Sequence, residues 1–544
     1  MNKFHKLMAA SVTVVAAGTL AACGNNSNSS SSGTKKTLNW MDKTEIEGMD
    51  LSKVTDATSF TQLNNTMEGL YRLGKNAKVK PGLATKTTTS KDGKTWTFIL
   101  RQNDKWSNGD PVTAQDFVYS WRRTVTPNTG SQYSYLFSGV KNADAIVAGK
   151  KKPTTLGVKA IGKDKLVVTL DKRIPYFKLL MGFPLFFPQN QKTVEKYGKS
   201  YGTSSKTTVY NGPFVQKGWT GSNLSWKLQK NKHYWDKKNV KLDTINFSVQ
   251  KTPSTDYNLY QAGKLDAALL GPQASKQLKH QKGYTLRKTA STIYLEMDQK
   301  KKPFSNENFR KAISLAVNRK ELANSVGGAA EPADTLSPEN MTEVNGKDYT
   351  DLVRGTATKK FNTYNKQQAQ AYWKKAQKEL GTKSECSFAI LTYDDDASKK
   401  GGEFLQSAIE SALKGVDVKV QSIPKKTALG HAGNGDYDVF LMGWTADFSD
   451  PISFLDLNMT HNFQNWEKYS DSTYDKLVAE SKVTPSEAKR WDSLVKAEQR
   501  IIDTQGVTPL YHPEEAWMVR SSVKNVVYNG AGAPYNFKEA YVEN

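Results

Sequence analysis

Apolar and polar residues follow two spacings along this chain, and each spacing predicts a set of elements. Alternation with a period of two predicts β-strands at residues 95–101, 165–170, 224–229, 241–249, 387–392, 416–421 and 437–442. Apolar residues three and four positions apart predict helices at 114–125, 256–262, 306–317, 366–380, 403–413, 474–481 and 485–505. Residues 387–443 follow the order strand, helix, strand, strand, which favours an α/β lobe with a partly parallel sheet.

The length of 544 residues predicts two or three lobes, because a single core rarely grows beyond ~300 residues. Hydrophobic residues make up 37%, aromatic residues 10% and charged residues 24% of the chain. This composition is typical of a globular protein and argues against both a fully disordered chain and a multi-span membrane protein. No internal repeat of 20 to 50 residues indicates a solenoid or a propeller.

The formal net charge is +24, and about +22 would remain after removal of a leader that contains Lys3 and Lys6. The lysines lie in small scattered groups rather than on one helix or in a finger motif, so no nucleic-acid partner is expected. A solvated lysine-rich surface is the simplest interpretation, with attraction to a polyanionic envelope or to anionic lipids as a secondary consequence.

The first residues predict export. A basic start is followed by an apolar stretch at residues 7–20 and then by Leu20-Ala21-Ala22-Cys23. The stretch is shorter than the ~20 residues that cross a bilayer, so it predicts a signal peptide over 1–22 rather than a membrane span. Its ending resembles the lipobox of bacterial lipoproteins, which implies that Cys23 is lipidated and anchored to the outer face of the cell membrane. The polar residues 23–35 predict a flexible tether.

Signatures of catalysis and of metal binding are missing from the sequence. The six histidines are far apart, without HxH or HExxH spacing, and no GxSxG, P-loop or GxGxxG motif is present. The second cysteine, Cys386, lies in an alternating run and is interpreted as a buried strand position. We therefore expect no catalytic residues, no metal and no cofactor, although a catalytic triad assembled from distant segments stays open.

One polar loop carries candidate binding chemistry. Residues 437–442 predict a strand buried on both faces, and Gly443, Trp444, Thr445, Ala446 and Asp447 leave its carboxyl end. Ligands of open α/β sheets bind beyond such strand ends. A carboxylate three residues after a large aromatic ring can hold a primary ammonium, and the backbone between them can pair with an extended peptide. The alternative is a turn aspartate with Trp444 as core filler.

Several stretches in register together resemble the oligopeptide-binding proteins, the extracytoplasmic solute-binding components of peptide ABC importers (family 5). They span about residues 37–540 and are 106–121, 211–214 with 230–236, 260–266, 303–313, 443–447 and 509–511. Some of these stretches can also be explained by local structure alone. Thr113 is a plausible N-cap with Asp116 three residues later, so residues 106–121 predict a turn and a scaffold helix.

The resemblance implies an α/β fold of two lobes, a type II periplasmic-binding-protein-like clamp with an extra third domain. Lobe I would combine residues 36–62, 207–291 and 508–544, the extra domain would be 63–206, and lobe II would be 292–507. Crossings near 291 and 507 would form the hinge, and closure around a ligand would report occupancy to a membrane permease.

The resemblance also assigns site residues. Asp447 would meet the α-amino group of a peptide. Thr55, Asp56 and Ala57, within 54–58, would form the partner strand for its backbone, and Tyr133 would approach from the smallest domain. An arginine that receives the peptide carboxylate in some members is replaced here by Leu441. Lys399 or Lys400 could substitute, so ligand length stays open.

The expected function is capture of extended oligopeptides and their delivery to the permease subunits of an ABC transporter, by a monomer that is not an enzyme. Within the same fold, a peptide pheromone, a nickel chelate or an opine-like solute is the alternative cargo. An extracellular peptidase or an adhesin is a more distant alternative.

Overall fold

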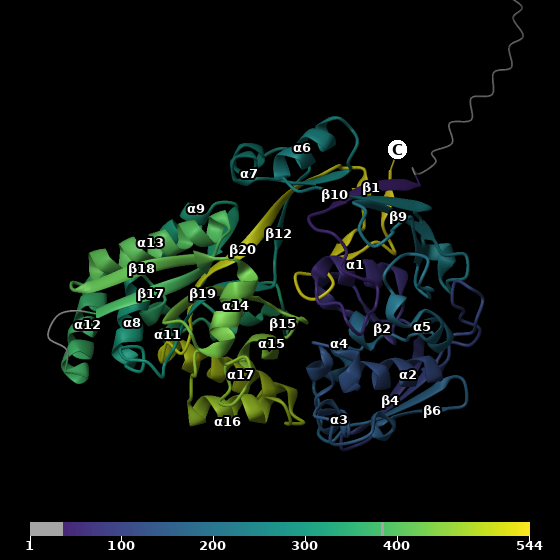
Figure 1. The fold of residues 1–544 in the computed structure, drawn as a ribbon, viewed down its shortest axis with the longest axis horizontal. Helices are drawn as coiled ribbons and strands as arrows, with labels where there is room; N and C mark the ends of the chain where they lie inside the picture. Colours follow the sequence, from purple (N-terminus) through teal and green to yellow (C-terminus); the bar gives the residue numbers. More distant parts are fainter. Residues whose placement is uncertain (1–35, 382–385, 544) are drawn as a thin grey trace, which may run out of the picture.

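The structure is a computed structural model that describes residues 36–381 and 386–543. The predicted signal peptide, Cys23 and the tether lie outside the described residues. Two large regions stand side by side and are joined by long strands (Figure 1). One region contains the N-terminal third of the chain, and the other contains residues from about 290 to 507.

A mixed sheet lies at one end of the first region (Figure 1). Its strands, in order, are β1 (Thr37–Asp42), β10 (Thr244–Val249), β9 (Ser225–Lys230) and β8 (Phe214–Lys217). β1 is parallel to β10, and the other pairs are antiparallel. Helix α1 (Ala57–Thr66) packs against β8. Chain segments separated by some 170 residues therefore build one sheet.

The other end of this region carries an antiparallel sheet. Its strands, in order, are β4 (Ala84–Thr89), β5 (Thr95–Leu100), β7 (Lys165–Thr169) and β6 (Val158–Ile161). Helix α2 (Ala114–Val125) covers β6 and β7. The predicted start of α2 is confirmed, because the Asp116 carboxylate accepts a hydrogen bond of 2.7 Å from the backbone N–H of Thr113.

The largest sheet has eight strands. Along its main path these are β11 (Ala267–Leu269), β20 (Thr508–Val519), β13 (Ser291–Met297), β19 (Val439–Thr445), β17 (Cys386–Tyr393) and β18 (Val416–Ile423), while β12 (Tyr284–Lys288) and β14 (Ala329–Pro332) also pair with β20. β17 is parallel to β18 and β19, whereas β13 is antiparallel to β19. The predicted partly parallel sheet is confirmed.

Helices flank this sheet, and those from residue 307 onward fill the second region (Figure 1). They are α6 (Pro253–Gln261), α7 (Pro272–Leu278), α8 (Glu307–Ala316), α9 (Arg319–Val326), α10 (Tyr349–Val353), α11 (Thr356–Phe361), α12 (Lys366–Leu380), α13 (Asp396–Ala412), α14 (Lys425–Asn434), α15 (Ile452–Leu455), α16 (Ser472–Ser481) and α17 (Glu487–Asp503). The first region also contains α3 (Ala143–Val147), α4 (Phe177–Leu180) and α5 (Gln191–Tyr197). Two-stranded pairs are β2 (Tyr71–Leu73) with β3 (Val79–Pro81), β15 (Glu343–Val344) with β16 (Lys347–Asp348), β21 (Val523–Lys524) with β24 (Tyr541–Val542), and β22 (Val527–Tyr528) with β23 (Tyr535–Asn536).

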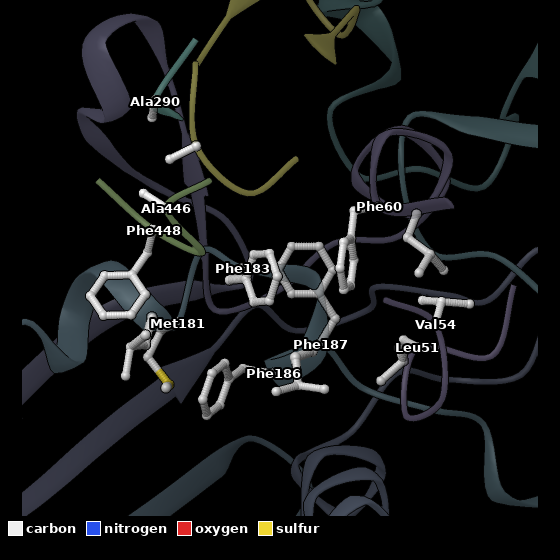
Figure 2. Packing of buried hydrophobic residues seen from close by; sticks show 14 of the residues in the cluster. Leu51, Val54, Phe60, Met181, Phe183, Phe186, Phe187, Ala290, Ala446 and Phe448 are labelled. Atoms are coloured by element: carbon white, nitrogen blue, oxygen red, sulfur yellow. The ribbon is translucent and has the colours of Figure 1, made fainter. Parts of the chain in front are cut away.

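Long strands connect the two regions. β12 and β13 follow one another in sequence, and both pair with β20, so two chain segments run together from one region to the other (Figure 1). Apolar packing also joins the regions. Ala446 and Phe448 lie in the same buried cluster as Phe60, Phe183 and Phe187 (Figure 2). The turn that follows β19 is therefore fixed against the first region.

Candidate ligand-binding site

Strand β19 begins at Val439 and continues to Thr445, so Gly443, Trp444 and Thr445 belong to the strand and not, as predicted, to the loop that follows it. Its carboxyl end lies at the junction between the two regions. Residues 439–442 are 6% exposed or less, because the strand has covered faces on both sides, as predicted. β19 pairs with β13 along its whole length, but β17 accompanies it only as far as Phe440. From Leu441 to Thr445 its other edge has no strand partner among the described residues. A strand edge of this kind can receive an extended chain.

Asp447 is placed at the centre of the junction. It is 7% exposed, and its backbone N–H donates to the Ser453 hydroxyl at 3.0 Å. Its carboxylate accepts a hydrogen bond of 2.6 Å from the hydroxyl of Tyr135, which belongs to the first region. The prediction that Asp447 lies between the two regions, and not on an outer face, agrees with this position.

The electrostatic environment of Asp447 is unusual for a buried carboxylate. Burial raises its pKa to about 6, although the Tyr135 and Tyr133 hydroxyls act in the opposite direction. The Asp447 charge and burial in turn raise the pKa of both tyrosines far above the usual value. No lysine, arginine or histidine of the described residues forms an ion pair with Asp447. The site therefore holds a negative charge that only neutral groups stabilise.

A small pocket of about 90 Å³ lies beside this carboxylate. Its walls are largely aromatic and aliphatic, with contributions from Tyr135, Tyr176, Trp444, Phe448 and Phe463. The Trp444 indole N–H is buried without a hydrogen-bond partner. Lys172 and Lys482 also line the pocket, but neither pairs with Asp447, and the Lys482 ammonium is paired with Asp456. An apolar pocket with an unmatched carboxylate suits an ammonium group that carries an apolar neighbour.

The backbone of the loop is only partly available to a ligand. The N–H of Ala446 donates to the Ala290 carbonyl at 2.8 Å, and the Ala446 carbonyl accepts from Gly532 at 3.1 Å. Both backbone groups of Ala446 therefore attach the turn to neighbouring loops, and the role of Ala446 in binding stays a prediction. The unpaired strand edge at Gly443, Trp444 and Thr445 is still available to a ligand.

The opposite wall differs from the predicted partner strand. Residues 54–56 are not part of a strand, and Ala57 is the first residue of α1. The Asp56 carboxylate caps this helix by accepting from the Ser59 N–H at 2.7 Å, which ends the extended segment at Asp56. A helix N-terminus leaves its first N–H groups without intrahelical partners, so this wall offers donors instead of a complete strand edge.

Ala57 and Thr445 face a common pocket of about 460 Å³. It is also lined by the end of β1, by α1 and by β20. Thr55 is half-buried before the helix, and Asp56 lies beside the pocket without being part of its lining. One residue of each predicted wall, Ala57 and Thr445, therefore lines the same pocket, whereas Gly443 and Trp444 do not line it.

Tyr133 and Tyr135 extend from one short segment toward the junction. Their rings are stacked with 5.8 Å between centroids, and Tyr133 packs edge-on against Phe60. Tyr135, which sequence reasoning did not single out, makes the shortest contact with Asp447. Tyr135 lies in a 3-10 turn at Ser134–Phe137, and no local pattern connects it with a residue 312 positions away.

The Leu441 side chain does not face the pockets. It is 2% exposed and packs in the core beside Gly401 of α13. Lys399 and Lys400 are exposed on α13 and line none of the pockets described here. Cys386 is the half-buried first residue of β17, where burial raises the pKa of its thiol to about 11. The strand position predicted for it is confirmed, although it is less buried than expected.

Two kinds of feature are absent from residues 36–381 and 386–543. No three histidine, cysteine, aspartate or glutamate side chains gather in a way that could hold a metal ion. Within residues 36–381 and 386–543, none of the helices combines the length and apolar character that a bilayer crossing requires.

Comparison with known proteins identifies the family. The family described as bacterial extracellular solute-binding proteins, family 5 middle, matches residues 78–466. This chain is a family-5 bacterial extracellular solute-binding protein. A dipeptide-binding protein of Lactococcus lactis subsp. cremoris (strain MG1363) is 35% identical over 99% of this chain and 100% of the relative. The predicted resemblance is thereby confirmed.

Solved structures agree with this assignment. OppA of Listeria monocytogenes bound to peptide has a TM-score of 0.78 at 39% identity and covers 94% of this chain and 99% of its own. The pheromone receptor PrgZ has a TM-score of 0.78 at 37% identity and covers 94% of this chain and 100% of its own. The family-5 protein described here thus has the mixed α/β, multi-domain solute-binding fold that the sequence predicts.

Proposed function

We propose that this family-5 protein is the extracytoplasmic peptide-binding component of an ABC importer. It captures an extended oligopeptide between its two regions and delivers it to membrane permease subunits. The observation that carries the proposal is Asp447, a buried carboxylate at the junction that lacks an internal cation. A peptide ammonium would supply the missing charge, and burying it unpaired would cost several kcal/mol.

Recognition of many sequences requires contacts with the peptide backbone. The unpaired edge of β19 from Leu441 to Thr445 can add a peptide as a further strand, and the first N–H groups of α1 can donate from the opposite side. Variable side chains would then enter the 460 Å³ pocket and its surroundings, where bridging water costs only ~0 to 2 kcal/mol each. Asp447 fixes the register, and Tyr133 and Tyr135 orient its carboxylate.

Closure around the ligand would signal occupancy to the permease. We assign lobe I to residues 36–62, 207–291 and 508–544, the extra domain to 63–206 and lobe II to 292–507. The paired segments β12–β13 and β20 are the two connections between the regions, and a few residues at each can absorb a hinge rotation. Contacts between the regions at Tyr135 and Asp447 favour the closed arrangement.

A lipid on Cys23 would keep the protein at the outer face of the cell membrane. The Leu20-Ala21-Ala22-Cys23 ending supports this assignment, and the polar residues 23–35 would give the body freedom to reach a permease. Mass spectrometry of the chain isolated from a membrane fraction tests it. We expect an N-terminal peptide that begins at Cys23 with a diacylglyceryl modification, and an unmodified Cys23 would overturn the anchor.

A peptide pheromone is the alternative cargo, because PrgZ is a pheromone receptor with the same fold. Either cargo uses Asp447 in the same way. Related proteins bind solutes, and we assign this chain no enzymatic activity of its own.

A defined peptide pool distinguishes these functions. The purified chain is incubated with the pool, separated by gel filtration, and both fractions are analysed by mass spectrometry. Intact peptides retained by the protein support capture, whereas shortened peptides in the supernatant would indicate a peptidase. Absence of retained peptides would contradict the proposal. The Asp447→Asn variant is the matched control, and it should retain far less of every peptide with a free N-terminus.

A further inference from the structure

The 460 Å³ pocket between Ala57 and Thr445 has a polarity that the binding of peptide backbones does not require. We call it the acidic pocket, after the carboxylates of Asp42, Glu514 and Glu515 in its lining. Lys43 is the one cationic residue that lines it. The walls around these groups include Met41, Trp517, Tyr528 and Tyr535. Apolar walls with carboxylates along them suit a long aliphatic chain that ends in a positive charge.

The cations near the acidic pocket satisfy only one of its carboxylates fully. Glu515 pairs with Lys43, accepts from the Trp517 indole N–H at 3.0 Å, and has its pKa lowered by the nearby positive charges despite burial. Arg287, one of these charges, donates to the Tyr535 hydroxyl at 2.6 Å and lies 4.5 Å from the centroid of the Trp517 ring. Glu515 is therefore already matched within the protein.

Glu514 and Asp42 have weaker positively charged partners than Glu515. Lys288 lies 3.8 Å from Glu514 but only 2.6 Å from Glu339, which is its nearer partner. Burial raises the pKa of Glu514 to about 7. Asp42 is 8% exposed, forms no ion pair among the described residues, and accepts one hydrogen bond of 3.3 Å from the Gln62 amide. Burial raises its pKa to about 8, with a small addition from the Asp56 charge, although the Gln62 hydrogen bond and the Lys43 charge act in the opposite direction.

These contacts indicate which peptide side chains the acidic pocket prefers. This inference rests on the proposed function. We propose that the acidic pocket accepts the cationic side chain of a lysine or arginine in the bound peptide, with Asp42 and Glu514 as the groups that receive its charge. The aromatic and methionine walls would hold the aliphatic stem. A free ammonium or guanidinium would let both carboxylates ionise, so its binding would release protons at neutral pH.

The preference for cationic side chains is opposite to the preference that the net charge of the whole protein would produce. A net charge of +24 repels cationic peptides and attracts anionic ones at long range. Long-range attraction alone would therefore rank glutamate peptides above lysine peptides at low salt. A preference for lysine that survives at high salt, where exposed charges are screened, would have to come from local contacts.

Matched peptides test the acidic pocket. Alanine pentapeptides with a free N-terminus carry lysine, norleucine, glutamine or glutamate at each position in turn, and their dissociation constants are measured by isothermal titration calorimetry with the full chain. We expect one position at which lysine binds about tenfold more tightly than norleucine, the affinity ratio for one partly buried ion pair. Repetition in buffers of different ionisation enthalpy should reveal proton release with lysine and none with norleucine.

Variants connect this preference to the pocket. Asp42→Asn should abolish most of the lysine preference and leave the affinity for the norleucine peptide nearly unchanged. Glu514→Gln is a second variant in case Asp42→Asn folds poorly. Asp492→Asn, which removes an exposed carboxylate of α17, is the control with the same change in charge and should keep the full preference.

The outcomes separate this inference from the proposed function. Equal binding of lysine and norleucine peptides at every position would overturn the acidic pocket but support peptide capture. A lysine preference that persists in both Asp42→Asn and Glu514→Gln would also overturn it. If no pentapeptide bound at any position, the proposed function itself would fail. Binding of free cadaverine as tightly as the lysine peptide would contradict a side-chain site.

Discussion

Asp447 and Asp450 lie in the same loop, three residues apart, and both are buried, at 7% and 4% exposure. Asp450 is paired with Arg490, whose guanidinium donates to its two carboxylate oxygens at 2.7 and 2.9 Å. Asp447 meets only neutral hydroxyl groups. The protein thus balances the charge of one carboxylate from its own chain and leaves the other unbalanced. This difference separates a structural carboxylate from one that is available to a ligand.

Asp450→Asn should have the largest effect on stability. Removing one member of a buried pair leaves Arg490 without its partner and typically costs ~3 to 5 kcal/mol. Arg490 is 4% exposed and lies over the rings of Tyr176 and Trp491, so the loss should also loosen the contact between the two regions. Urea denaturation measures the free energy of unfolding. An equal effect of Asp492→Asn, an exposed control, would contradict the comparison.

Asp447→Asn should increase the free energy of unfolding, whereas Asp450→Asn should decrease it. The folded-state pKa of Asp447, at about 6, is above the usual value of 3.8, so the ionised group opposes folding at high pH. The variant should therefore be more stable than the unsubstituted, ligand-free protein by about 1 to 3 kcal/mol at pH 8, and most of the difference should be lost at pH 4. Denaturation at both pH values measures this. Destabilisation at pH 8 would show that the carboxylate is already satisfied internally.

The affinity for peptides should depend on pH through the same group. An ammonium ligand binds the ionised carboxylate, so affinity falls as pH decreases through about 6, by at most about tenfold per pH unit. An N-acetylated peptide lacks the ammonium and should show no such decrease. Calorimetric titrations between pH 4.5 and 7.5 compare the two peptides. A parallel decrease for both would assign the pH dependence to another group.

Much of the fold could be predicted from local pattern. The predicted helices 114–125 and 366–380 coincide with α2 and α12, because strong apolar periodicity and clear caps define them. Helix α13 begins at Asp396, earlier than the predicted 403, and contains Gly401 and Gly402. A Cβ on Gly402 would lie 2.9 Å from the side chains of both Thr392 and Val420. Close packing on the sheet therefore explains glycines that the sequence pattern associates with a loop.

The candidate site was predictable only in part. Asp447 could be found because a buried strand followed by a polar loop marks the end of a sheet. Tyr135 could not be connected with it, since it lies 312 positions away in the chain and meets Asp447 only through tertiary structure. Asp42 is likewise distant in the chain from Glu514, with which it lines the acidic pocket. The strand predicted at residues 54–58 is absent, because Asp56 caps a helix that begins at Ala57 through a side-chain contact with Ser59.

The central claim is that Asp447 receives the N-terminal ammonium of a bound peptide. The most direct test measures dissociation constants for one peptide with a free and an acetylated N-terminus, in the unsubstituted protein and in Asp447→Asn. We predict a loss of about a hundredfold or more for the free peptide in the variant, and almost no loss for the acetylated peptide. Equal losses for the two peptides would contradict the claim.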